Sequence, residues 1–182
     1  MTATLIILVG LPGAGKSDYR ESHKDFNAVE VSTDDIRLEL FNVNSKQEYQ
    51  EKCFDGKARH EGTNDQLVFA TAKNRIRKNL KEGVNVIFEA INIKEAAVAN
   101  FIKIAQECGA EIKAYHFYCP LWELLRRNSL RGEANRDFDR FILESYYSNA
   151  LNLETGEMKL EWPTKYDIHV EKKNTLGNPK WQ

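Results

Sequence analysis

The stretch GLPGAGKS, from Gly10 to Ser17, combines residue types and spacings that are suited to holding a chain of phosphates. It matches the pattern G-x-x-x-x-G-K-[ST], in which the backbone N–H groups of a glycine-rich loop point at one anion. In that chemistry Lys16 reaches the β- and γ-phosphates of a nucleoside triphosphate, and the Ser17 hydroxyl holds Mg²⁺. A glycine turn that only ends a strand is the alternative, and the number of matched residues disfavours it. The residues assigned to the nucleotide and its metal are Gly10, Gly13, Ala14, Gly15, Lys16, Ser17 and Asp18.

A second group with chemical potential is the sequence STDDIR, which directly follows a predicted strand. Arg37 lies one turn on from Asp34, so the two side chains share one face of a helix. In this position Asp34 could act as the general base that accepts the proton of an attacking hydroxyl, while Arg37 fixes the acceptor. The alternative is a pair of acids that favour the first turn of a helix, with a solvated arginine. The neighbouring phosphate loop favours the catalytic interpretation.

A third group is RRNSLRG, which ends at Gly132. Arg127 and Arg131 are four residues apart and would project together from a helix. Planar guanidinium groups stabilise the charge that phosphoryl transfer spreads over the equatorial oxygens. The polar stretch that follows suits a lid that closes over the nucleotide. The alternative is an ordinary charged helix face, which is how we interpret Arg126.

These motifs are positioned by a predicted alternation of strands and helices. Strands are predicted at 4–9, 28–31, 84–88 and 111–119, with a fifth within 165–172. Helices are predicted at 16–24, in STDDIRLELF, within 46–80 with breaks near Gly56 and Gly62, at 95–107, from Pro120 onward and at about 137–150. The alternation predicts an α/β fold with a mainly parallel sheet of four to five strands and helices on both faces. Together with the phosphate-loop motif and the arginine group, it indicates the three-layer fold of P-loop NTPases and kinases with a helical lid. Because sites form at the carboxyl ends of parallel strands, the segments 10–17, 32–37 and 89–92 are expected to converge.

Composition narrows the class of protein. The 182 residues suit one ordinary domain, and 42% hydrophobic with 29% charged residues is typical of a soluble globular protein. The formal net charge of −1 gives no overall basic field, although a local groove could still be basic. No apolar run is long enough to span a membrane, and the three cysteines read as free thiols in a reducing cytosol. We therefore expect a cytoplasmic protein.

In their order and spacing, GLPGAGKS, STDDIR and PLWELLRRNSLRG resemble the kinase domain of phage polynucleotide kinase. The likeness runs from about Leu5 to Ala150, and WELLRRNSLRG is its most distinctive part. That family transfers the γ-phosphate of ATP to the 5′-hydroxyl of DNA or RNA. The resemblance implies ATP and Mg²⁺ at Lys16 and Ser17, a base at Asp34, the acceptor's phosphate near Arg37, and lid arginines at Arg127 and Arg131. It also implies the host cytoplasm as the location if the chain is phage-encoded.

The chain departs from that family after the third predicted strand. Where the family has an aspartate and a threonine that help form the acceptor site, this chain has Ala90 and Ile91. Glu89 could supply a displaced carboxylate, lie near Mg²⁺ as a strand-end acid, or be a partly exposed glutamate. The first of these is opposed by strand alternation, because a shift of one residue points a side chain to the other face. We include Glu89 and Asn92 among the substrate-binding candidates.

Residues 1–150 are predicted to form a P-loop kinase domain, and residues 151–182 a C-terminal extension with an edge strand and a loose tail. The expected acceptor is the 5′-hydroxyl end of a nucleic acid. One alternative is a kinase for a small hydroxylated molecule, nucleoside or modified nucleotide, which the neutral charge and the Ala90–Ile91 pair favour. The other is a nucleotide-dependent switch without an acceptor. Asp34 and the arginine pair weigh against it, because a switch does not need an acceptor base. No membrane partner is expected, and the sequence indicates no oligomeric state.

Overall fold

The computed structural model describes residues 2–22, 27–53, 63–130 and 136–177. Its centre is a five-stranded sheet in the order β2-β3-β1-β4-β5, and every neighbouring pair is parallel. The fold confirms the predicted α/β architecture. The strands are β1 (Thr4–Val9), β2 (Ala28–Ser32), β3 (Asn85–Glu89), β4 (Glu111–Tyr118) and β5 (Val170–Asn174).

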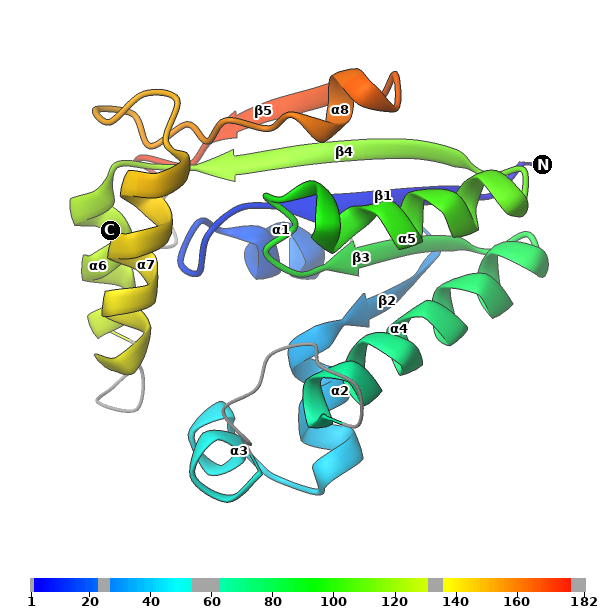
Figure 1. Ribbon diagram of the computed structural model, residues 1–182, viewed down its shortest axis with the longest axis horizontal. Helices are drawn as coiled ribbons and strands as arrows, with labels where there is room; N and C mark the ends of the chain where they lie inside the picture. The colour runs from blue at the N-terminus through cyan, green and yellow to red at the C-terminus, as the bar shows by residue number, and fades with distance from the viewer. Residues whose placement is uncertain (1, 23–26, 54–62, 131–135, 178–182) are drawn as a thin grey trace.

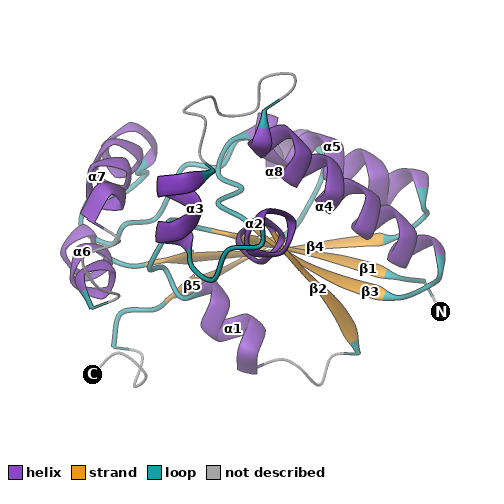
Figure 2. Ribbon diagram, turned by 90° about the horizontal axis from the view of Figure 1, so that it is seen from below, coloured by secondary structure: helices purple, strands orange, loops and turns teal. Residues whose placement is uncertain are grey.

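Helices cover both faces of this sheet. Figure 2 shows α1 against one face and α4, α5 and α8 against the other. In Figure 1, α6 and α7 lie side by side beyond the carboxyl ends of the strands, and α2 and α3 lie below the end of β2. The helices are α1 (Lys16–Ser22), α2 (Thr33–Phe41), α3 (Lys46–Lys52), α4 (Asn64–Lys81), α5 (Glu95–Glu107), α6 (Leu121–Ser129), α7 (Arg136–Asn149) and α8 (Trp162–Lys165).

The aliphatic run TLIILV forms the central strand because a strand covered on both faces must be apolar on both sides. Leu5, Ile7 and Leu8 are fully buried in the core. Truncating one such side chain to alanine typically costs about 2–5 kcal/mol. This strand leads directly into the phosphate loop, so a strand that is buried on both faces anchors the candidate site.

The register of the sheet brings strand ends together. Glu89, the last residue of β3, is aligned with Leu8 of β1 on one side and with Ser32 of β2 on the other. The residues that follow these three strands therefore start from the same edge of the sheet. This is the geometry that the predicted convergence of three segments requires.

Two of the differences from the predicted element boundaries bear on the site. Strand β3 starts at Asn85 rather than Val84, because the Val84 N–H donates to the Asn79 carbonyl and closes the end of α4. This shift brings Glu89 into the strand. Pro120 was expected as the first helical residue, but it is the N-cap of α6, and its carbonyl accepts from the N–H groups of Glu123 and Leu124.

Residues 151–177 are packed against the rest of the fold. Strand β5 pairs with β4 as a sheet edge, as expected for an edge strand, but it starts at Val170, after α8 and a turn at Asp167 (φ 52°). The short helix α8 was not predicted. Its Trp162 is fully buried, and the indole Nε1–H donates to the Asn92 carbonyl at 3.1 Å. The division at residue 150 stays a prediction.

In the described part of the chain, none of the helices combines the length and apolar character that crossing a bilayer requires.

Candidate functional site

The phosphate loop joins β1 to α1, and its first glycine leaves no room for a side chain. Gly10 has a φ of +149°, and a Cβ at this residue would lie 2.5 Å from the Phe117 carbonyl oxygen. Its N–H donates to the Ile91 carbonyl at 3.0 Å, which ties the loop to the segment after β3. The Lys16 ammonium lies within the loop and donates to the carbonyls of Gly10 (2.8 Å) and Leu11 (3.0 Å).

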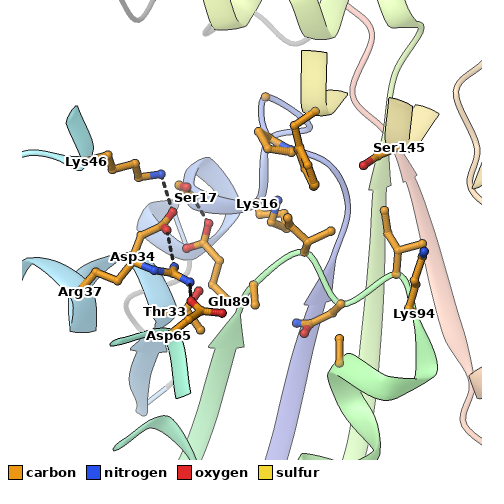
Figure 3. A pocket seen from close by; sticks show the side chains of 18 of the residues that line it. Lys16, Ser17, Thr33, Asp34, Arg37, Lys46, Asp65, Glu89, Lys94 and Ser145 are labelled. Carbon is orange, nitrogen blue, oxygen red and sulfur yellow. Dashed lines mark hydrogen bonds and ion pairs between the residues drawn. The ribbon is translucent and has the colours of Figure 1, made fainter. Parts of the chain in front are cut away.

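A pocket of about 720 Å³ opens above the loop. Figure 3 shows that its labelled side chains come from the loop, from α2, α3 and α4, from the end of β3, from the N-cap of α5 and from α7. The three predicted segments therefore do meet at one place. The predicted site residues that line the pocket are Gly13, Gly15, Lys16, Ser17, Asp34, Arg37, Glu89 and Asn92. Gly10, Ala14, Asp18 and Arg127 are not among the lining residues, and Arg131 lies outside the described residues.

Ser17 and Glu89 form one corner of the pocket. The Ser17 hydroxyl donates to Glu89 Oε1 at 2.7 Å, and Arg20 Nε lies 3.4 Å from Glu89 Oε2. Glu89 is 9% exposed, so of the three interpretations of this residue a partly exposed surface glutamate is wrong. Arg20 also contacts Glu30 at 3.3 Å and Asp35 at 2.6 Å. These two contacts hold the Arg20 guanidinium beside the Glu89 carboxylate.

These oxygen atoms suit Mg²⁺, which prefers hard oxygen ligands and takes few of them from protein, the others coming from phosphates and water. Among the described residues, no three or more His, Cys, Asp and Glu side chains group together as a metal site. A metal here would thus be held by Ser17, with Glu89 beside it, and by the phosphates of a bound nucleotide. The fit to a magnesium–nucleotide complex is good, and the fit to a metal held by protein alone is poor.

Asp34 faces the same pocket from the first turn of α2. The helix is capped by Ser32, whose Oγ accepts the Asp35 N–H at 3.3 Å, so Asp34 sits next to the cap and at the strand end. Its side chain is 43% exposed, and its carboxylate contacts Lys46 of α3 and Arg37 Nη1, the latter at 3.1 Å. Burial alone would raise the pKa of the Asp34 carboxyl. The cations Lys46, Arg37 and Lys16 outweigh that effect and hold the pKa below its ordinary value, so the group is ionised.

Arg37 is held between two carboxylates. It bonds to Asp34 through Nη1 and to Asp65 of α4 through Nη2. Its guanidinium carbon lies 5.9 Å from the centroid of the Tyr49 ring, within the range of a cation–π contact. Three neighbours on different helices thus fix the direction of one guanidinium group beside the proposed base.

Asn92 forms part of the pocket floor. It is 1% exposed, has a φ of +55°, and donates through Nδ2 to the Leu8 carbonyl at 2.9 Å. Its Oδ1 is buried and has no hydrogen-bond partner among the described residues. The side chain therefore joins β1 to the segment after β3, and a contact between Asn92 and an acceptor stays a prediction.

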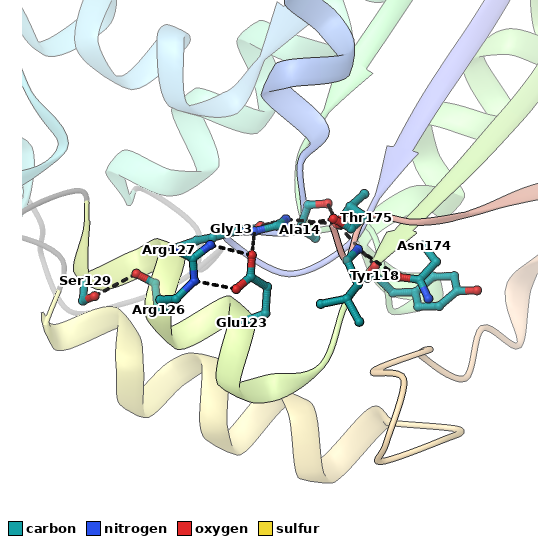
Figure 4. A network of polar contacts seen from close by, with 10 residues as sticks. Gly13, Ala14, Tyr118, Glu123, Arg126, Arg127, Ser129, Asn174 and Thr175 are labelled. Atoms are coloured by element: carbon teal, nitrogen blue, oxygen red, sulfur yellow. Dashed lines mark hydrogen bonds and ion pairs between the residues drawn. The ribbon is translucent and has the colours of Figure 1, made fainter. Parts of the chain in front are cut away.

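Arg127 differs most from its predicted role. The side chain is fully buried behind the phosphate loop, and its donors bond to Glu123, Gly13 and Thr175 (Figure 4). A guanidinium group held in this way does not point at the pocket, so the described arrangement does not show the predicted lid arginine. The reason is packing: the α6 face that carries Arg127 lies against the loop and not against solvent. The lid assignment stays a prediction for Arg131.

The charged residues of the site that sequence reasoning missed include Arg20, Lys46 and Asp65. Each looks like an ordinary helical charge in the sequence, because the residue it contacts lies on another element. The available signal was weak. Lys46 and Asp65 both follow a capping residue, Ser45 and Thr63, so both lie in the first turn of a helix.

Comparison with known proteins gives the chain a family. Residues 5–146 match the family model AAA_33, described as an AAA domain. The chain belongs to this family of P-loop kinase domains. The match covers the whole phosphate loop, the Asp34 helix and α6, and the recognition of a P-loop kinase from the three sequence motifs is confirmed.

Two curated relatives of this AAA_33 kinase carry different names. One is described as a bifunctional polynucleotide kinase/RNA ligase of Autographa californica nuclear polyhedrosis virus, 26% identical over 139 residues, which are 76% of this chain and 19% of the relative. The other is an L-seryl-tRNA(Sec) kinase of Methanococcus maripaludis, 30% identical over 135 residues, which are 71% of this chain and 46% of the relative. The chain thus spans less than half the length of either relative, and the family does not determine the acceptor.

Solved structures with a similar fold also include a kinase. A chain of the Pnkp1/Rnl/Hen1 complex is 26% identical with a TM-score of 0.55, over 69% of this kinase and 39% of that chain. A kinase from Chloroflexus aurantiacus is similar over 76% of this chain and 75% of its own, with a TM-score of 0.58 and 14% identity. At that identity the second likeness shows the fold alone.

Proposed function

We propose that this kinase transfers the γ-phosphate of ATP to the 5′-hydroxyl end of a nucleic acid, with Asp34 as the general base. One observation carries the proposal: the ionised Asp34 carboxylate lines the same pocket as Lys16 and Ser17 of the phosphate loop. A donor held at the loop and an acceptor held at α2 would then react across a single pocket.

On the donor side, the loop binds the phosphates through backbone N–H groups, assisted by the positive end of α1. The Lys16 ammonium already lies at the loop and needs only to exchange a carbonyl contact for a phosphate oxygen. Mg²⁺, when bound with the nucleotide beside Ser17 and Glu89, would neutralise charge on the β- and γ-phosphates.

On the acceptor side, Asp34 would accept a hydrogen bond from the hydroxyl and take its proton as the bond to phosphorus forms. The bond from the γ-phosphorus to the bridging oxygen breaks, and ADP leaves with that electron pair. Lys46 and Arg37 keep Asp34 ionised, which makes it an orienting group for the hydroxyl at neutral pH.

Cations on the acceptor side support a nucleic-acid end. Arg37 and Lys46 flank Asp34, and Lys94 lines the opposite wall of the pocket (Figure 3). Such groups suit the phosphate that follows a 5′-hydroxyl nucleotide. The name of the viral relative, a polynucleotide kinase, supports the same acceptor class.

A second candidate is a kinase for a hydroxyl that is not at a nucleic-acid end. Ala90 and Ile91 line the pocket where the resemblance leads one to expect polar groups, and Phe69 and Ile93 extend the apolar wall. The name of the archaeal relative, which is a seryl-tRNA kinase, supports this alternative.

The deciding experiment offers γ-labelled ATP with a panel of acceptors: 5′-hydroxyl DNA, 5′-hydroxyl RNA, nucleoside 3′-monophosphates and free nucleosides. We expect label on the 5′ end of an oligonucleotide, with an affinity that falls as salt rises because bound phosphates release counterions. Label only on a monomer would favour the second candidate. Release of inorganic phosphate with no labelled acceptor would overturn both. The Asp34→Asn variant measures the background.

A further inference from the structure

We propose that Thr175, at the end of β5, is a positioning residue of the ATP site that acts through Arg127. Together with Glu123 these two residues form a brace behind the phosphate loop (Figure 4). The C-terminal segment, by which we mean β5 and Thr175, therefore helps to position the ATP-binding loop. The inference concerns ATP binding and does not depend on which hydroxyl accepts the phosphate.

Arg127 is the centre of the brace. Its Nη1 donates to the Gly13 carbonyl at 3.0 Å and to Thr175 Oγ1 at 3.0 Å, and its Nη2 donates to the Thr175 carbonyl at 2.6 Å. Its Nε donates to Glu123 Oε1 at 2.7 Å, and both side chains are almost fully shielded from water. A buried charge that is paired and bonded at every nitrogen is held in one orientation.

Thr175 adds direct contacts to the loop. Its Oγ1 donates to the Ala14 carbonyl at 3.1 Å, and its methyl carbon lies 3.3 Å from the place where a Cβ on Gly15 would stand. Its own N–H donates to the Tyr118 carbonyl at 2.9 Å, which fixes it to the end of β4. Thr175 thus touches two successive loop residues from the side opposite the pocket.

The consequence follows from the planarity of the peptide bond, in which the C=O and the following N–H point in opposite directions. Thr175 holds the Ala14 carbonyl on the side away from the pocket, so the Gly15 N–H is turned towards the pocket, which Gly15 lines. Arg127 holds the Gly13 carbonyl, so the Ala14 N–H is turned inward, where it donates to the Leu11 carbonyl at 3.1 Å. The brace therefore pre-aligns an N–H group for phosphate and closes the turn before it.

Pre-alignment of this kind strengthens binding because the loop does not have to be ordered when the nucleotide arrives. It also makes the linkage reciprocal: if docking of the C-terminal segment favours ATP, then ATP favours docking of that segment by the same factor. The contact between Thr175 and Ala14 joins residues 161 positions apart. Nothing in the local sequence around Thr175 indicates this role.

The first test compares Thr175→Val with Thr175→Ser. Valine keeps the shape and removes the hydroxyl, while serine keeps the hydroxyl. We expect Thr175→Val to raise the Kd and the KM for ATP about tenfold, because it removes both the donor to the Ala14 carbonyl and the acceptor of Arg127 Nη1, with the acceptor KM unchanged. Thr175→Ser should bind ATP nearly as the wild type does. Thr164→Val, at an exposed threonine of α8, is the matched control and should change neither constant. Wild-type ATP affinity in Thr175→Val would overturn the proposal.

A second test uses the unaltered chain, so it does not depend on how a variant folds. ATP should slow hydrogen exchange at the Thr175 amide, which is bonded to Tyr118 in β4. Equal exchange with and without saturating ATP would overturn the proposal. A chain that binds ATP with this protection but phosphorylates no acceptor would overturn the proposed function and leave the brace intact.

Discussion

The hydroxyl of Ser17, in the first turn of α1, donates a 2.7 Å hydrogen bond to Glu89 Oε1, at the last position of β3. The bond joins the phosphate loop to a neighbouring strand and puts two oxygen atoms side by side at the pocket wall. Its position depends on β3 ending at Glu89, one residue later than the sequence pattern predicts.

We expect Glu89→Gln to raise the Mg²⁺ concentration needed for half-maximal activity several-fold, because an amide is a weaker metal partner than a carboxylate. The measurement is a magnesium titration of the rate at saturating ATP. Glu30→Gln is the matched control, since Glu30 also contacts Arg20 but is not bonded to Ser17. A titration curve that coincides with that of the wild type would remove Glu89 from the metal site.

Replacing the proposed base should separate chemistry from binding. We expect Asp34→Asn to lower kcat by about 10²–10⁴-fold, the usual contribution of a general base, while ATP binding stays near that of the wild type. Lys16→Ala should lose both. The control is Asp35→Asn, because the adjacent Asp35 carboxylate is bonded to Arg20 and not to the acceptor side. Transfer by Asp34→Asn at the wild-type rate would show that the base is elsewhere.

Asp65 should act on the acceptor through Arg37. We expect Asp65→Asn and Arg37→Ala each to raise the acceptor KM more than the ATP KM, because Asp65 fixes the Arg37 guanidinium beside Asp34. If the two residues act as one unit, the double variant should lose less than the sum of the single losses. If the losses of the two single variants add up to that of the double variant, the two residues act independently. A larger effect on the ATP KM than on the acceptor KM would assign Arg37 to the donor side.

His116 should make the stability of the fold depend on pH. Burial lowers the pKa of its imidazole to about 4, an effect that Glu157 opposes and Lys172 reinforces, and Nε2 accepts the Met158 N–H at 3.4 Å. The unfolded chain, with an ordinary histidine pKa of 6.5, binds a proton between these values that the folded chain does not. The contribution of the neutral His116 side chain to the free energy of unfolding is therefore complete above pH 6.5, and it is lost as the pH falls from 6.5 towards 4.

The check is the variant His116→Gln, which keeps an acceptor for Met158 and does not titrate. Between pH 7 and pH 5 the free energy of unfolding of the wild type should fall by about 2 kcal/mol more than that of the variant. Denaturant unfolding at the two pH values measures this difference. Parallel losses in the two proteins would mean that the pKa of His116 is the same in the folded and the unfolded chain.

Much of the fold could be predicted because its signals are local. The aliphatic run before Gly10 and the helical spacing of apolar residues from Glu95 to Glu107 match β1 and α5 at both ends. The strand at 84–88 was displaced by one residue, since hydrogen bonding at the end of α4 decides where it starts. Helix α8 was missed because four residues are too few to show a period, and the buried Trp162 has no local mark.

The candidate site divides in the same way. The sequence by itself determined the phosphate loop, the position of Asp34 after a strand, and the family to which these motifs belong, because a few consecutive residues limit the backbone and supply the chemistry. Only the tertiary structure decided that Asp65 holds Arg37, that Glu89 meets Ser17, and that Arg127 is buried against Thr175. These contacts join residues 28, 72 and 48 positions apart, and strand register and helix packing set which side chains face each other. The pattern of charges along the sequence therefore does not indicate which side chains contact each other.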